Sequence, residues 1–358
     1  MTTDPRPRHF PIRPDWLALR RETAVDPDQP IIDAHHHLWD KPGARYLAAE
    51  MTDDTGSGHT VVATVFVEGK TGHLPDGLPA LRPTGETAMI AGLAAEADAE
   101  GATRFAAGIV AYADLRLGTA VAEVLDRHAE VARGRLRGIR DPAAWHADPS
   151  ARGSVILPPP GMLHDAAFRR GLAELTRRDL SFDAWVYHTQ LAELADLAHA
   201  MPDTRLVINH TGGPIGIGPY ANRRAEVFDD WRQGMKTLAG FENVVVKMGG
   251  FGMLMSGFDF ADRPLPPTSD ALAAAWGPYF RECIALFGPD RCMFESNFPV
   301  DKGTAPYGTL WNAFKKIVAD HSADERHAVF FGCANRTYRL GMTAPAEPSI
   351  ARPDRGKG

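Results

Sequence analysis

Eight short apolar runs, each followed by a turn and a stretch with helical periodicity, constrain this 358-residue chain more than any other feature. The runs that we expect to form strands are Ile31–Ala34, Val61–Val67, Arg104–Ala111, Leu136–Ile139, Phe182–Val186, Leu206–Ile208, Val244–Val246 and Cys292–Phe294. Strands that alternate with helices form a parallel sheet covered by helices. Eight is the number of strands that closes a (β/α)₈ TIM barrel.

The helical stretches are recognised by their apolar faces. Phe228, Trp231, Met235 and Leu238 recur at helical spacing. Leu310, Phe314, Ile317 and Val318 do the same later in the chain. The last helix is predicted to begin at Ser322, because Glu325 completes a capping box with it.

Polar residues follow the expected strands at their carboxyl ends, and this favours a closed barrel over an open sheet. In a closed barrel these ends meet at one mouth, whereas in an open sheet the outer ones would lie far apart. The residues at these ends are His35, His37, Glu68, Arg140, His188, His210, Lys247, Glu295 and Asn297.

Three strand-to-helix connections are longer than the common 2–6 residues, namely Gly69–Gly85, Asp141–Leu163 and Gly249–Thr268. In a barrel all three would surround the mouth, where long loops usually cover a substrate. We expect an N-terminal extension over residues 1–29, one barrel domain over 30–342 and a disordered tail over 343–358.

Composition limits the partners that this chain can have. A net charge of −6 argues against nucleic acid or an anionic membrane as partner, so a small-molecule substrate is expected. No run approaches the roughly 18 apolar residues of a membrane span, and the N-terminus lacks a signal-peptide core, which favours a cytoplasmic protein. The composition is also compatible with a homo-oligomer. The glycines of 212–219 lack the spacing of a nucleotide-binding loop, so no nucleotide cofactor is expected.

The sequence Asp33-Ala34-His35-His36-His37 gives the first candidate site. Residues two apart on a strand point to one side, so His35 and His37 would meet at a common point while His36 faces away. Such a pair could bind a metal ion or polarise a carbonyl group. The alternative is a set of three histidines in a polar loop.

Four segments resemble barrel strands 1, 4, 6 and 8 of the amidohydrolase-related family, a branch of the amidohydrolase superfamily that includes sugar-acid lactonases and 2-pyrone-4,6-dicarboxylate lactonase. They begin at Asp33, Arg137, Val207 and Met293, and the resemblance covers roughly Ile31 to Leu340. It implies a distorted TIM barrel and hydrolysis of a lactone or amide. By position, His35, His37 and His210 would bind a divalent metal ion, such as zinc or manganese, or the substrate carbonyl. His188 falls where a further ligand could lie, or it caps the helix that follows.

The last of these motifs departs from the family. Family lactonases commonly have an aspartate as general base where this chain has Asn297, and an amide cannot accept that proton. Glu295 shares a strand face with Asn297, so it could act as the catalytic carboxylate instead. Alternatively, Glu295 ligates a metal while Asn297 holds a water or a substrate oxygen, or Glu295 forms an ion pair with Lys247 or Arg140.

Arg140 could bind a substrate carboxylate with two hydrogen bonds, or it forms a salt bridge with Asp141 or Glu68. Glu68, Lys247 and Trp39 are further candidates for substrate binding. Together these features predict a hydrolase that opens a lactone, or an amide, of a small carboxylated or polyhydroxylated compound. The alternatives are a non-oxidative decarboxylase of an aromatic acid, for which Glu-x-His is usual on strand 1, and a non-catalytic binding protein.

Overall fold

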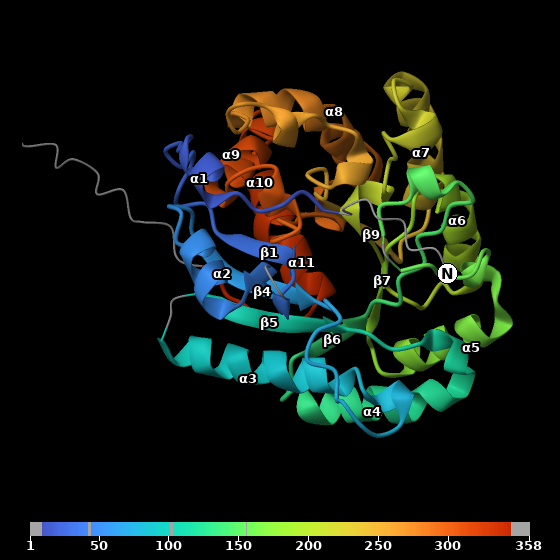
Figure 1. The fold of residues 1–358 in the computed structure, drawn as a ribbon. Coiled ribbons are helices and arrows are strands. Elements are labelled where there is room, and N and C mark those ends of the chain that lie inside the picture. The colour runs from blue at the N-terminus through green and yellow to red at the C-terminus, as the bar shows by residue number, and fades with distance from the viewer. Residues whose placement is uncertain (1–8, 42–43, 101–102, 155, 345–358) are drawn as a thin grey trace, which may run out of the picture.

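The computed structural model describes residues 9–41, 44–100, 103–154 and 156–344 (Figure 1). Eight parallel strands form one sheet in the order β1-β4-β5-β6-β7-β8-β9-β10. The strands are β1 Ile31–His36, β4 Val61–Val67, β5 Arg104–Ala111, β6 Leu136–Ile139, β7 Ser181–Ala184, β8 Leu206–Ile208, β9 Val244–Met248 and β10 Cys292–Phe294. A small antiparallel pair, β2 Trp39–Lys41 and β3 Ala44–Tyr46, follows the first strand.

The sheet curls until its two edge strands meet, just beyond the carboxyl ends of β10 and β1. The backbone N–H of Asn297 donates to the carbonyl of His35 at 2.9 Å, and the N–H of His37 donates to the carbonyl of Phe298 at 2.7 Å. The result is a nearly closed parallel barrel with helices between the strands, so the predicted TIM barrel is confirmed.

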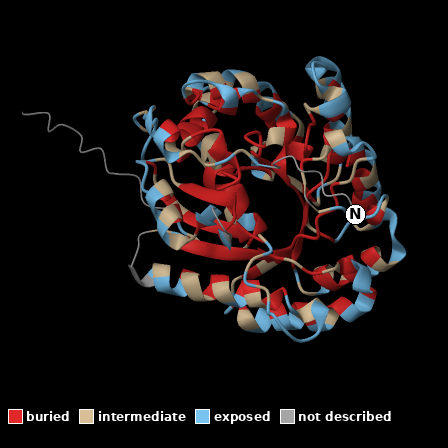
Figure 2. Ribbon diagram, viewed as in Figure 1, coloured by how far each residue is buried: buried red, intermediate tan, exposed pale blue. Residues whose placement is uncertain are grey.

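Helices cover the outside of the barrel, with buried residues on the strands and on the inward helix faces (Figures 1 and 2). Of the predicted apolar face of α7, Trp231, Met235 and Leu238 are buried and Phe228 is half-buried. Ser322 caps α10 with Glu325 as expected. The helices are α1 Pro14–Ala18, α2 Ala48–Thr55, α3 Thr84–Glu100, α4 Val121–Val131, α5 Ala166–Arg177, α6 Leu191–Ala200, α7 Arg224–Ala239, α8 Ser269–Phe287, α9 Tyr307–Ile317, α10 Ala323–His327 and α11 Cys333–Thr337. In the described part of the chain, no helix has the length and apolar character needed to cross a bilayer.

A β-bulge in β1 decides which histidines face the inside of the barrel. Asp33 pairs with Thr64 and His36 with Phe66, so three steps along β1 match two steps along β4. Ile32 and Ala34 pack in the barrel interior, and the extra residue reverses the alternation that follows them. His36 therefore faces outward, where its ring packs near Phe66 and Phe105, and His35 and His37 face inward.

Residues 13–20 run along the outside of the loop that follows β9. Trp16 Nε1 donates to the carbonyl of Arg263 at 3.0 Å, and Arg20 Nε donates to that of Pro266 at 2.8 Å. The three long loops contribute Gly69, Gly153 and Met253 to the wall of one cavity, so they do surround the mouth. The division into extension, barrel and tail stays a prediction, and residues 345–358 of the tail lie outside the described residues.

Candidate active site

A cavity of about 160 Å³ lies at the carboxyl ends of the strands. The residues predicted from the sequence that line it are His37, Trp39, Glu68, Arg140, His210 and Asn297. His35 and Glu295 are fully buried. His35 contacts His37, and Glu295 contacts His210, both of which line the cavity. The barrel thus brings residues from five separate strand ends to one small site.

The imidazoles of His35 and His37 meet through their Nε2 atoms, which lie 3.2 Å apart. His37 Nδ1 is 2.9 Å from the carbonyl of Val67, to which it donates, so its Nε2 carries a lone pair. His35 Nδ1 lies 2.8 Å from a carboxylate oxygen of Glu295, which assigns the same tautomer to His35. Two lone pairs therefore converge on one point.

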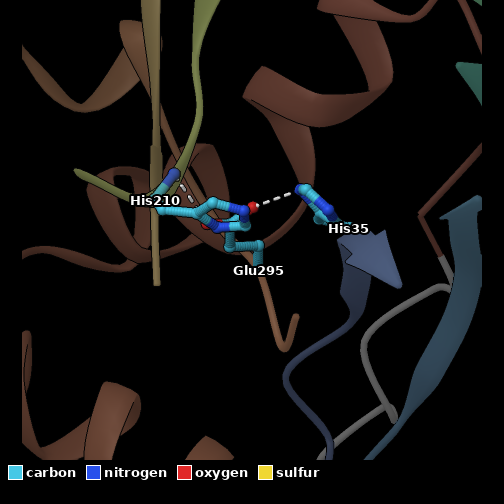
Figure 3. Close-up of side chains that lie close together, drawn as sticks. All are labelled: His35, His210 and Glu295. Atoms are coloured by element: carbon cyan, nitrogen blue, oxygen red, sulfur yellow. Dashed lines mark hydrogen bonds and ion pairs between the residues drawn. The ribbon is translucent and has the colours of Figure 1, made fainter. Parts of the chain in front are cut away.

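Glu295 bridges His35 and His210, as Figure 3 shows. Its Oε1 is 2.7 Å from His210 Nδ1 and also accepts the backbone N–H of His210 at 3.0 Å. Its Oε2 faces His35. Both oxygens are thus engaged by imidazoles, and the ion pair with Lys247 or Arg140 that the sequence left open is not the arrangement found. These contacts favour a carboxylate that orients two imidazoles over one that receives a proton from water.

Local backbone geometry makes this packing possible. A Cβ on Gly249 would lie 2.4 Å from Glu295 Cγ, and one on Gly250 would lie 2.6 Å from His210 Cβ. His210 itself has φ 52°, a left-handed conformation that is unusual for a residue other than glycine. Strained backbone of this kind is common at functional sites.

Burial controls the charge of the three histidines. It lowers the pKa of His35 and of His37 well below the usual range. The positive charge of Arg140 lowers both pKa values further, and that of Lys247 lowers the pKa of His35. Burial also lowers the pKa of His210, although Glu295 opposes this. All three imidazoles are therefore neutral near pH 7, which is the form that binds a metal ion or accepts a proton.

This donor set fits a divalent metal ion. The Nε2 atoms of His35 and His37, 3.2 Å apart, are imidazole nitrogens of the kind that bind zinc in proteins. The oxygen acceptors behind each Nδ1 are the usual outer partners of metal-binding histidines. His35, His210 and Glu295 also place one potential ligand atom each within 4.8 Å of one another.

His188 does not join this cluster. Its Nδ1 accepts the backbone N–H of Ile215 at 3.3 Å, and its ring packs against Tyr220. The residue opens the short turn that leads into α6, but the N-cap of α6 is Gln190 and the His188 side chain caps neither segment. Neither the metal-ligand nor the capping alternative therefore describes its contacts. The reason is positional, because β7 ends at Ala184 and leaves His188 four residues beyond the strand.

Arg140 forms the salt bridge that the sequence offered as an alternative. Its Nε and Nη2 donate to the side chain and the carbonyl of Glu68, each at 2.8 Å. Its Nη1 lies 3.3 Å from His35 Nε2. Most of the guanidinium is thus engaged by Glu68, and its remaining donors face the histidines.

Two further sequence candidates have different surroundings. Lys247 is fully buried, with Nζ 2.7 Å from Asp183 Oδ2 and 5.0 Å from the ring centroid of Tyr338, so its contacts are structural. Trp39 lines the cavity and stacks on His37 with ring centroids 5.6 Å apart.

Sequence reasoning missed several residues of the cavity. Lys70 reaches it from the loop after β4, with Nζ 4.6 Å from the ring centroid of Tyr112. His9 reaches it from the N-terminal segment, which no strand pattern marks. Asp301 lies behind Asn297, and the i, i+4 spacing of these two residues was the available signal.

A parallel eight-stranded barrel with histidines and a carboxylate gathered at its carboxyl mouth is the architecture of the amidohydrolase superfamily. The chain belongs to this family, because the family model described as "Amidohydrolase" matches residues 32–340. The resemblance inferred from the four strand motifs is thereby confirmed.

Three similar proteins place the chain within the family. "Uncharacterized protein y4mH" of Sinorhizobium fredii is 36% identical over 87% of this chain and 99% of its own length. The L-fucono-1,5-lactonase of Burkholderia multivorans is 28% identical over 88% of this chain and 98% of the relative. An amidohydrolase from Burkholderia multivorans, solved with bound zinc, is 25% identical with a TM-score of 0.68 and covers 87% of this chain and 99% of that structure.

Proposed function

We propose that this protein is a hydrolase that opens a small lactone ring, and that an amide is the less favoured substrate. The observation that carries the proposal is the pair of inward-facing imidazoles of His35 and His37 beside His210 at the cavity. A volume of about 160 Å³ suits a compact ring compound. The lactonase relative supports the same class of reaction.

His35 and His37 would hold a divalent ion, which when bound supplies Lewis-acid polarisation of the lactone carbonyl. Without an ion, polarisation would fall to Arg140, whose Nη1 lies beside His35. Each arrangement lowers the cost of negative charge on the carbonyl oxygen as water attacks. Manganese or zinc suits the imidazole ligands.

The proton of the attacking water goes to His210 in this proposal. His210 Nδ1–H donates to Glu295, which leaves Nε2 to accept that proton on the cavity side. The carboxylate of Glu295 stabilises the imidazolium that forms, as in other carboxylate–histidine pairs. The new C–O bond forms as the carbonyl π bond opens onto its oxygen. The ring C–O bond breaks when the carbonyl re-forms, and the proton passes from His210 to the leaving alkoxide. The product is a hydroxy acid.

The charges around the cavity favour a small carboxylated or polyhydroxylated substrate. Lys70 presents an ammonium group at its edge, and Trp39 offers an apolar ring beside His37. A sugar-acid lactone combines a ring of suitable size with hydroxyl groups for such contacts.

A panel of sugar-acid γ- and δ-lactones, assayed by acid release with added zinc, with added manganese and with chelator, tests this proposal. Ring opening of at least one lactone by wild-type protein, lost in His210→Asn, is the expected result. Release of carbon dioxide from aromatic acids without lactone opening would favour the decarboxylase. Absence of both activities in metal-replete protein would favour a binding protein.

A further inference from the structure

Asn297 presents an unpaired hydrogen-bond acceptor to the cavity. The residue is 1% exposed, its Oδ1 is buried, and no described residue donates to that atom. Buried polar atoms are almost always paired, so an exception at a cavity wall calls for a ligand group. Asn297 also donates its backbone N–H to the carbonyl of His35, and it lines the same cavity as His37 and His210, whose imidazoles would hold a substrate carbonyl.

Asp301 determines which end of the amide faces the cavity. Asn297 Nδ2 donates to Asp301 Oδ1 at 2.8 Å, and the other carboxylate oxygen accepts the backbone N–H of Gly252 at 2.9 Å. The N–H of Asp301 in turn donates to the carbonyl of Asn297 at 3.1 Å. With both oxygens of Asp301 facing N–H donors, the Nδ2 of Asn297 stays turned toward it and Oδ1 stays turned toward the cavity.

We infer that Asn297, held by Asp301, selects ligands that carry a hydroxyl group on the carbon next to the reacting carbonyl. The inference deepens the proposed function and rests on it for the nature of the substrate. A hydroxyl donates to Oδ1, whereas a group that only accepts hydrogen bonds leaves this buried oxygen unpaired. Asp301 is the positioning residue of the pair, and Asn297 is the specificity-determining residue.

The substitution Asp301→Asn turns this arrangement into a test. The backbone N–H of Gly252 cannot reverse, so the new amide must direct its oxygen there and its NH₂ group toward Asn297. Asn297 must then flip, which places Nδ2 in the cavity. A donor at this point is satisfied by an acceptor as well as by a hydroxyl, so the selection is lost. The exchanged pair Asn297→Asp with Asp301→Asn restores an oxygen facing the cavity.

Binding of 2-hydroxycyclopentanone and 2-fluorocyclopentanone measures the selection without requiring turnover. The two ketones cannot be hydrolysed, and they differ in whether the substituent donates a hydrogen bond. We expect the wild type to prefer the hydroxy ketone roughly tenfold, the worth of one buried hydrogen bond. We expect Asp301→Asn and Asn297→Leu to have a ratio near one, and the exchanged pair to recover the preference.

Thr304→Val is the matched control. The Thr304 hydroxyl donates to the carbonyl of Gly252, so this variant loosens the same loop and leaves the hydrogen bond between the Asn297 and Asp301 side chains in place. It should keep the tenfold ratio. An unchanged ratio in folded Asn297→Leu would overturn the inference, and so would equal affinity of the wild type for both ketones. Hydroxyl selection without opening of any lactone would reject the proposed function alone.

Discussion

His36 lies between the two cavity-facing histidines in the sequence, yet its surroundings are those of a structural residue. Its Nε2 is 2.9 Å from Thr64 Oγ1, and burial lowers its pKa to about 3. We expect His35→Ala and His37→Ala each to lower turnover at least 10²-fold, because each removes a group that polarises the carbonyl. His36→Ala should keep the activity of the folded enzyme and cost about 2–4 kcal/mol of stability, as buried truncations do.

Zinc binding by calorimetry, turnover and urea unfolding, measured on all three variants, check this prediction. Equal loss of activity at the three positions would show that the bulge does not separate His36 from its neighbours. Thr64→Val is a useful companion, since it removes the partner of His36 from the outer face and leaves the cavity untouched.

Glu295→Gln tests whether this residue orients the imidazoles or acts as a base. The backbone N–H of His210 keeps an oxygen at its place, so the new NH₂ group would face His35 Nδ1. His35 must then adopt the other tautomer, which protonates its Nε2 and removes a lone pair from the site. We expect turnover to fall by about 10² or more and zinc affinity by 10–100-fold, the range for such outer partners. Loss of turnover at unchanged zinc affinity would favour the base instead.

The strand pattern was sufficient to predict that His35, His37, His210 and Glu295 lie at one site, because each follows or ends an expected strand. It could not show which way Glu295 turns. Residue 295 lies just past β10, and its direction depends on Gly249, which leaves room for its side chain, while Gly250 leaves room for His210.

At the scale of elements, five of the eight strands have the predicted bounds, and β1, β7 and β9 differ from them by one or two residues at an end. The bulge in β1 was not predictable in the same way. Pairing is a property of two strands, and nothing within residues 31–37 alone reveals that three residues match two on β4. The pattern placed His35 and His37 on one face correctly but could not say that this face is the inside.

Helix α3 holds the first loop of the cavity through Glu86. Its Oε1 accepts the backbone N–H groups of Gly69 and Thr71, which flank Lys70, at 3.0 and 2.8 Å. Burial and the nearby charge of Glu68 raise the pKa of Glu86 from 4.5 to about 8, although these two N–H groups oppose the shift. The folded protein therefore holds the proton more tightly than the unfolded chain does.

The sign of this shift predicts a pH dependence. The stabilisation is complete below pH 4.5 and disappears as the pH rises through about 8, because the unfolded chain releases the proton first. Glu86→Gln keeps the accepting oxygen and cannot ionise. The free energy of unfolding of this variant should match that of the wild type near pH 5 and exceed it by about 4 kcal/mol or less at pH 8.5. Urea unfolding at the two pH values provides the measurement. Other buried carboxyl groups have raised pKa values in both proteins, so their contribution cancels in the difference between the two free energies of unfolding. An unchanged difference between pH 5 and 8.5 would contradict the prediction.

At the scale of the whole molecule, the barrel interior contains a polar layer below the cavity. Asp183 accepts hydrogen bonds from the Tyr338 hydroxyl at 2.8 Å and from Asn209 Nδ2 at 3.2 Å, and Lys247 completes the group. Tyr338 follows α11 and packs with Phe331 and Leu340 among the interior residues. The C-terminal segment is thereby joined to β7 and β9. The sequence predicted a position at the mouth for Lys247 because the residue follows an expected strand, and it gave no sign of Asp183 as its partner.

Lys247→Met separates a structural role from the substrate-binding role that the sequence indicated. Removing the ammonium group leaves the buried charge of Asp183 without its cation, at a cost on the order of 3 kcal/mol. The double variant Asp183→Asn with Lys247→Met removes both charges, and the new amide oxygen can still accept from Tyr338, so it should recover most of this loss. Unfolding in urea measures both effects, and KM for an active lactone should stay near the wild-type value. A raised KM at unchanged stability would instead mean that Lys247 reaches the substrate.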